Sequence, residues 1–96
     1  MKFVHIAYHF EFTELVEKIL DGCEITEYVR YPLVDGCDVD GKHFGTQVFP
    51  GNNAVIQALM AEEKVTGLLE ALGRFREEKK AHEHLRAAVI GIERKI

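Results

Sequence analysis

The spacing of the hydrophobic side chains is first that of a β-strand, then that of a helix, then that of a β-strand again. This order occurs once before and once after a glycine-rich stretch. Alternation of residues between two faces is typical of β-strands, whereas apolar residues three and four positions apart are typical of helices. In chain order, the predicted elements are a strand over Lys2–Phe10, a helix between Thr13 and Gly22, strands over Ile25–Val34 and Asn53–Met60, a helix from Glu62 to about Lys80 and a strand over Arg86–Glu93. Thr13 is predicted to cap the first helix and Gly22 to end it. Gly67 and Gly73, inside the second helix, predict close packing on the sheet.

This order is that of the ferredoxin-like βαββαβ fold, an α+β arrangement in which two helices cover one face of a four-stranded antiparallel sheet. The 96 residues predict a single domain, residues 1–96, with a small core. Pro32 predicts that the end of the second strand lies at an edge. The uncovered face of such a sheet is normally polar, but here it is largely apolar in the first, third and fourth strands. We therefore expect the open faces to pack together in an oligomer, most simply a closed ring.

The stretch between the two halves, Val34–Gly51, holds four of the eight glycines and predicts a long loop without regular structure. Loops of this length in small domains are usually functional, because binding residues concentrate on loops that a rigid scaffold holds. The residues predicted to lie near a bound effector are Gly36, Gly41, Lys42, His43, Gly45 and Thr46, together with Arg94 after the last strand. The loop is therefore the candidate effector loop.

The charge and the apolar pattern exclude several classes of partner. The net charge is −4 and no basic run is present, which argues against nucleic acid. No apolar run approaches the roughly 20 residues of a membrane span, and the first residues lack the core of a signal peptide. We therefore expect a cytoplasmic protein without direct membrane insertion, in which Cys23 and Cys37 are reduced thiols.

Histidines and one cysteine form the candidate metal ligands. His82 and His84 flank Glu83 between the second helix and the last strand, and imidazoles are common ligands of zinc, copper and nickel. Two ligands do not make a site, so Cys37, His43 or residues of a neighbouring subunit would have to complete it. The alternative is an exposed polar turn.

His5 and His9 lie on one face of the first strand, about 13 Å apart at about 3.3 Å per residue, so they cannot share an ion. If the open face lines a threefold axis, three copies of His5 meet there, either as a metal site or as a satisfied interface histidine. No nucleophile–base pair stands out among the residues, so we do not expect an enzyme.

The whole chain resembles, in pattern, the PII signal-transduction superfamily and specifically its divergent PII-like branch. The resemblance rests on the order of elements, on the position of Val34–Gly51 and on the sequence pattern of several short segments. These segments are Asn53–Leu59, Glu63–Val65, Leu68–Leu72, Phe75–Glu77, Ala87–Ile90 and Ile92–Arg94. The resemblance implies a homotrimer whose sheets face the threefold axis, a small-molecule ligand in the clefts between subunits, and a loop that docks onto a partner, often a membrane transporter.

Two departures from the family pattern affect the expected ligand. Members that bind ATP carry a glycine-rich, basic turn between the second helix and the last strand, whereas Ala81–Leu85 contains neither glycine nor lysine. The basic C-terminal extension of those members is also missing. The leading hypothesis is thus a trimeric PII-like regulator that senses a nucleotide, bicarbonate or a metal ion and signals through its loop to a partner such as a transporter. The alternatives are a CutA-like metal-tolerance protein and a small dimeric α+β barrel enzyme.

Overall fold

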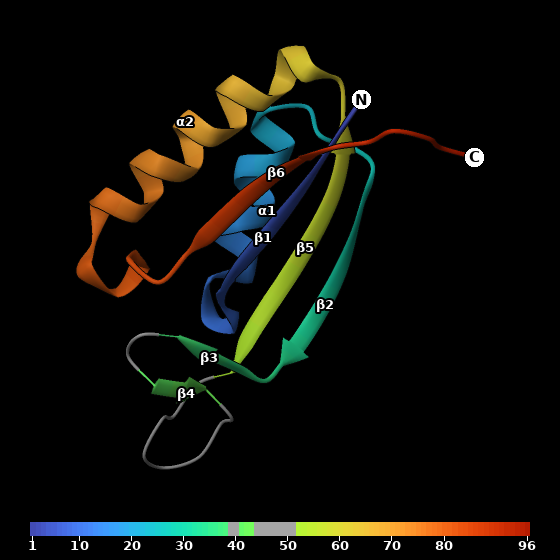
Figure 1. The fold of residues 1–96 in the computed structure, drawn as a ribbon. Coiled ribbons are helices and arrows are strands. Elements are labelled where there is room, and N and C mark those ends of the chain that lie inside the picture. The colour runs from blue at the N-terminus through green and yellow to red at the C-terminus, as the bar shows by residue number, and fades with distance from the viewer. Residues whose placement is uncertain (39–40, 44–51) are drawn as a thin grey trace.

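The computed structural model describes residues 1–38, 41–43 and 52–96, and for 36–38 and 41–43 it describes the backbone alone. The elements in chain order are β1 (Lys2–His9), η1 (Phe10–Phe12), α1 (Thr13–Gly22), β2 (Tyr28–Val34), β3 (Gly36–Asp38), β4 (Gly41–His43), β5 (Asn53–Met60), α2 (Glu62–Glu78), η2 (Lys80–His82) and β6 (Arg86–Gly91). Four strands form one antiparallel sheet in the order β2-β5-β1-β6, and α1 and α2 pack on it (Figure 1). The predicted ferredoxin-like arrangement is confirmed.

The hydrophobic core lies between the sheet and the two helices. Alternate residues of β1 and β5 are buried, as the predicted strand period requires. The buried helix residues come from one stripe of each helix. The core consists of Val4, Ile6, Tyr8, Val16, Leu20, Ile25, Ala54, Ile56, Ala58, Met60, Leu68, Leu72, Phe75 and Leu85.

The opposite, open face of the sheet is largely apolar, as predicted. Strand register places on it Phe3, His5 and Ala7 of β1, Val29 and Tyr31 of β2, Val55, Gln57 and Leu59 of β5, and Ala88 and Ile90 of β6, with the polar residues His9, Asn53 and Arg86 at one end. Val29 and Ile90 are 57% and 53% exposed in the single chain. This face therefore leaves large hydrophobic side chains in water.

The two ends of the sheet differ, and we name them by their residues. At the hairpin end, His9 pairs with Asn53, Ala7 pairs with Arg86, and the two-stranded β3–β4 ladder lies beyond β2 (Figure 1). At the terminus end, Lys2 pairs with both Met60 and Gly91. The β3–β4 ladder means that Val34–Gly51 is not wholly without regular structure, contrary to the prediction.

Two local predictions about helices were wrong, those for Thr13 and for Gly67 and Gly73, and one was confirmed. Thr13 is the first residue of α1 rather than its cap, and its hydroxyl donates to the Phe10 carbonyl oxygen at 2.8 Å. Helix α1 does end at Gly22, as predicted, and the left-handed residue that follows its end is Glu24, with φ 59°. Added Cβ atoms on Gly67 and Gly73 would meet no described heavy atom within 4 Å, so these glycines do not mark close packing.

Strand β2 is an edge strand, as Pro32 predicted. Its pairing with β5 follows one register up to Tyr31 and a shifted one at Val34, with Pro32 between them. In the part of the chain that the structure describes, no helix is long and apolar enough to cross a membrane.

Candidate functional site

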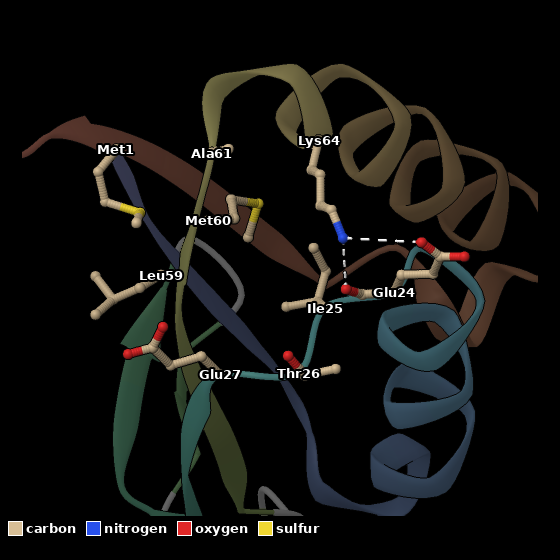
Figure 2. A pocket seen from close by; sticks show the side chains of 9 residues that line it. All are labelled: Met1, Glu24, Ile25, Thr26, Glu27, Leu59, Met60, Ala61 and Lys64. Carbon is tan, nitrogen blue, oxygen red and sulfur yellow. Dashed lines mark hydrogen bonds and ion pairs between the residues drawn. The ribbon is translucent and has the colours of Figure 1, made fainter.

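A hollow of about 180 Å³ lies at the terminus end of the sheet, where α1 passes into β2 and β5 passes into α2 (Figure 2). Its lining residues are Met1, Glu24, Ile25, Thr26, Glu27, Leu59, Met60, Ala61 and Lys64. Local sequence patterns do not reveal this hollow, because its residues come from three separate stretches of the chain that only the fold brings together. We call it the terminus-end hollow.

The wall of this hollow is built by the end of α1. The Ile25 N–H donates to the Leu20 carbonyl at 2.9 Å and the Glu24 N–H to the Asp21 carbonyl at 3.0 Å, which turns the chain sharply after the helix. Lys64 of α2 reaches across and donates from Nζ to the Glu24 carbonyl oxygen at 2.7 Å (Figure 2). One ammonium group therefore ties the first turn of α2 to the end of α1.

A second site lies at the hairpin end, where α2 passes into β6. Arg76 of α2 donates from Nη2 to the Glu83 carbonyl oxygen at 3.3 Å, and Arg86 of β6 donates from Nη1 to the same oxygen at 2.6 Å. Two guanidinium groups thus converge on one carbonyl, and we call them the arginine pair. Arg76, but not Arg86, also lines a hollow of about 140 Å³, together with Leu69, Leu72, Gly73, Leu85 and Ala87.

The arginine pair supplies the positive charge that Ala81–Leu85 itself lacks. Guanidinium groups suit phosphate and carboxylate oxygens because they are planar, permanently charged and carry several N–H donors. The composition of the turn does not reveal these residues, because Arg76 and Arg86 belong to α2 and β6, the two elements that flank it.

His82 is part of the core rather than an exposed turn residue. It is 3% exposed, and its ring stacks on Phe75 with 3.8 Å between ring centroids. The ring also meets the edge of Phe12 at 4.7 Å between centroids. Its Nδ1–H donates to the Phe75 carbonyl oxygen at 2.7 Å, which is one of the last four carbonyls of α2. His82 therefore closes the C-terminal end of α2.

The predicted metal set remains a prediction. His84 is half-buried and makes interactions of its own. The side chains of Cys37 and His43 lie outside the described residues, while Cys23 is a half-buried free thiol. Among the described residues, no three His, Cys, Asp or Glu side chains come together as a metal site would require.

The predicted effector residues fall at the two ends of the sheet. The backbones of Gly36, Gly41, Lys42 and His43 belong to the β3–β4 ladder at the hairpin end, whereas Gly45 and Thr46 lie outside the described residues. Arg94 follows β6 at the terminus end, where the Ile92 N–H donates to the Met1 carbonyl at 3.4 Å. One chain therefore does not bring Arg94 to the other predicted residues.

A third hollow, about 480 Å³, is lined by Phe10, Glu11, Thr13, Glu14, Arg30, Pro32 and Leu33. Arg30 forms an ion pair with Glu17, so its charge is already compensated. Glu11 and Glu14 leave the hollow net acidic, which does not suit an anionic ligand.

No protein-family model and no curated protein matches this sequence. Its fold matches that of CPII, a nitrogen regulatory PII-like protein from Thiomonas intermedia K12, in the structure bound to ADP, AMP and bicarbonate. The TM-score is 0.73 with 24% identity, over 97% of this chain and 88% of that chain. CPII bound to ADP, AMP and acetate gives a TM-score of 0.65 with 24% identity, over 97% and 88% of the two chains. A PII-like signalling protein from Thermus thermophilus gives 0.61 with 18% identity, over 93% and 83%. The chain thus has the fold of PII-like proteins.

Proposed function

We propose that this chain is a PII-like regulatory protein that binds a small anionic effector, a nucleotide or bicarbonate, between copies of itself. The observation that carries the proposal is the arginine pair, two guanidinium groups held on one carbonyl, of which Arg76 also lines a hollow. CPII, which has the same fold, binds ADP, AMP and bicarbonate. The arginine pair is the part of this chain suited to phosphate or bicarbonate oxygens.

The hollow of about 480 Å³ is net acidic, and the size of two other hollows supports a site shared between copies. Small-molecule sites usually enclose about 300–1,000 Å³. The hollow that Arg76 lines measures about 140 Å³ and the terminus-end hollow about 180 Å³. Neither is large enough alone for a nucleotide. In a closed ring, the hairpin end of one copy adjoins the neighbouring copy, which supplies the missing walls.

The assembly is a homotrimer in this proposal, with the open sheet faces turned inwards. The exposed Val29, Tyr31 and Ile90 favour it, because contiguous apolar surface of this kind commonly marks a protein interface. The stretch 34–51 then changes its order when the effector binds and signals to a protein partner such as a membrane transporter.

Titration calorimetry against ADP, AMP, bicarbonate and divalent metals tests this function, with light scattering to give the mass of the assembly. We expect a trimer, and we expect Arg86→Ala to weaken nucleotide binding at least tenfold. Arg74→Ala is the matched control, because Arg74 is an exposed α2 arginine outside the pair. A trimer that binds no member of the panel contradicts the proposed effector, and equal losses in both variants contradict the role of the arginine pair.

A further inference from the structure

One polar pair lies at the middle of the apolar open face. His5 of β1 and Gln57 of β5 are direct cross-strand partners, and β1 and β5 are the two inner strands of the sheet. Nε2 of Gln57 lies 3.5 Å from Nδ1 of His5. Both side chains are half-buried in the single chain. Packing the open faces together would bury this pair completely, and buried polar groups need partners.

The surroundings of His5 leave room for another copy to approach it. Its cross-strand partner on β6 is Ala88, and the next residue of β1 on the same face is Ala7. The larger side chain of Phe3 lies two residues from His5 towards the terminus end, and its cross-strand partners are Leu59 and Ile90. The imidazole therefore stands between small residues, with bulky apolar packing beside it.

A threefold axis restricts how three such imidazoles can be satisfied. Symmetry gives every copy the same tautomer, so the three Nε2 atoms present either three lone pairs or three N–H groups. Identical groups cannot pair with each other as donor and acceptor, whereas one partner on the axis can satisfy all three lone pairs at once. Three neutral imidazole nitrogens are a ligand set that suits a divalent transition metal, with further positions left for water.

We propose that His5 from each of three copies binds one divalent transition-metal ion on the threefold axis. This inference rests on the trimer of the proposed function. Nε2 is the ligating atom, and Gln57 is a positioning residue. A half-turn of the Gln57 amide presents Oε1 to the Nδ1–H group of His5, and such a partner fixes the tautomer of a ligating histidine. The ion would join the three copies at the centre of the assembly.

Metal analysis with Zn²⁺ and Co²⁺ as probes tests the site. The full chain is stripped with chelator, loaded and freed of excess metal, and its metal content is then compared with the mass from light scattering. We expect one ion per three chains and d–d absorption of bound Co²⁺. His5→Ala and His5→Gln should lose the ion, and Gln57→Leu should weaken binding about 10- to 100-fold. His9→Ala is the control, because His9 lies four residues along the same strand and contacts Glu11 at 3.2 Å.

The outcomes separate this inference from the proposed function. A trimer that binds no metal, that binds one ion per chain, or that keeps the ion in both His5 variants overturns the metal site and leaves the trimer intact. An assembly that is not trimeric overturns both. Loss of the ion in His5→Gln, with the trimeric mass retained, supports the site because it separates ligation from folding and assembly.

Discussion

Glu24 offers a sharp test of how α1 ends. Its φ of 59° lies in the left-handed region, where a residue with a Cβ is disfavoured by roughly 1–2 kcal/mol and where glycine is the usual helix-ending residue. Replacing it, Glu24→Gly, removes that steric cost. The Lys64 hydrogen bond is retained, because its acceptor is the main-chain carbonyl oxygen.

Two losses oppose this gain. The Glu24 carboxylate lies 4.0 Å from Lys64 Nζ and its side chain is 85% exposed, so the ion pair contributes at most about 0.5 kcal/mol. Glycine also has more freedom in the unfolded chain, which offsets part of the relief. We therefore expect a net stabilisation of about 0.5–1 kcal/mol, or a rise in Tm of about 2–8 °C for a domain of this size.

Urea denaturation at a fixed chain concentration measures this change, because the stability of an oligomer depends on concentration. Glu24→Gln separates the charge from the backbone and should lie within about 0.5 kcal/mol of the parent. Glu27→Gly is the matched control, since it makes the same substitution at a residue without a positive φ. A Glu24→Gly chain that is no more stable than both Glu24→Gln and the parent would refute the reasoning.

Two further predictions concern buried polar side chains. His82→Ala should lower the free energy of unfolding by roughly 2–3 kcal/mol, because it removes a ring that stacks on Phe75 and leaves the Phe75 carbonyl without its donor; urea denaturation checks this, and a loss below about 0.5 kcal/mol would contradict it. Burial raises the pKa of the Tyr8 phenol above its ordinary 10.0, and the Thr13 hydroxyl beside it acts in the opposite direction. The unfolded chain therefore loses the Tyr8 proton first, and stability should fall as the pH rises above about 10. Tyr8→Phe should flatten this fall, measured as unfolding free energy between about pH 8 and pH 11, and parallel curves for the two chains would count against it.

The sequence predicted the elements well because the periodicity of a core-facing element is a local property. The bounds of β5, Asn53–Met60, match the prediction, since alternate residues of that strand must all be buried. The end of α1 at Gly22 was also predicted, but the left-handed turn after it was not, because that turn is made by Glu24 and supported by Lys64 from a distant helix. A contact of that kind leaves no local pattern.

The candidate site was less predictable for the same reason. His82 looks like a residue of a polar turn, but Phe12, seventy positions earlier, places an aromatic edge against it. The arginine pair is defined by a main-chain carbonyl, that of Glu83, which side-chain spacing does not reveal. In the proposed ring, the hairpin end of one copy would meet a neighbouring copy. Such an assembly involves several chains, and the sequence of one chain indicates it only through the apolar open face.

The change of register in β2 has a consequence for aggregation. A flat, exposed edge strand is a template onto which further chains can add without limit. In β2, Pro32 has no N–H to offer an incoming strand, and the regular pairing with β5 already stops at Tyr31. Regular strand addition on this edge is therefore confined to Tyr28–Tyr31, a segment too short to seed a fibril readily but adequate for a finite contact between neighbours. Pro32 therefore limits strand addition at the β2 edge.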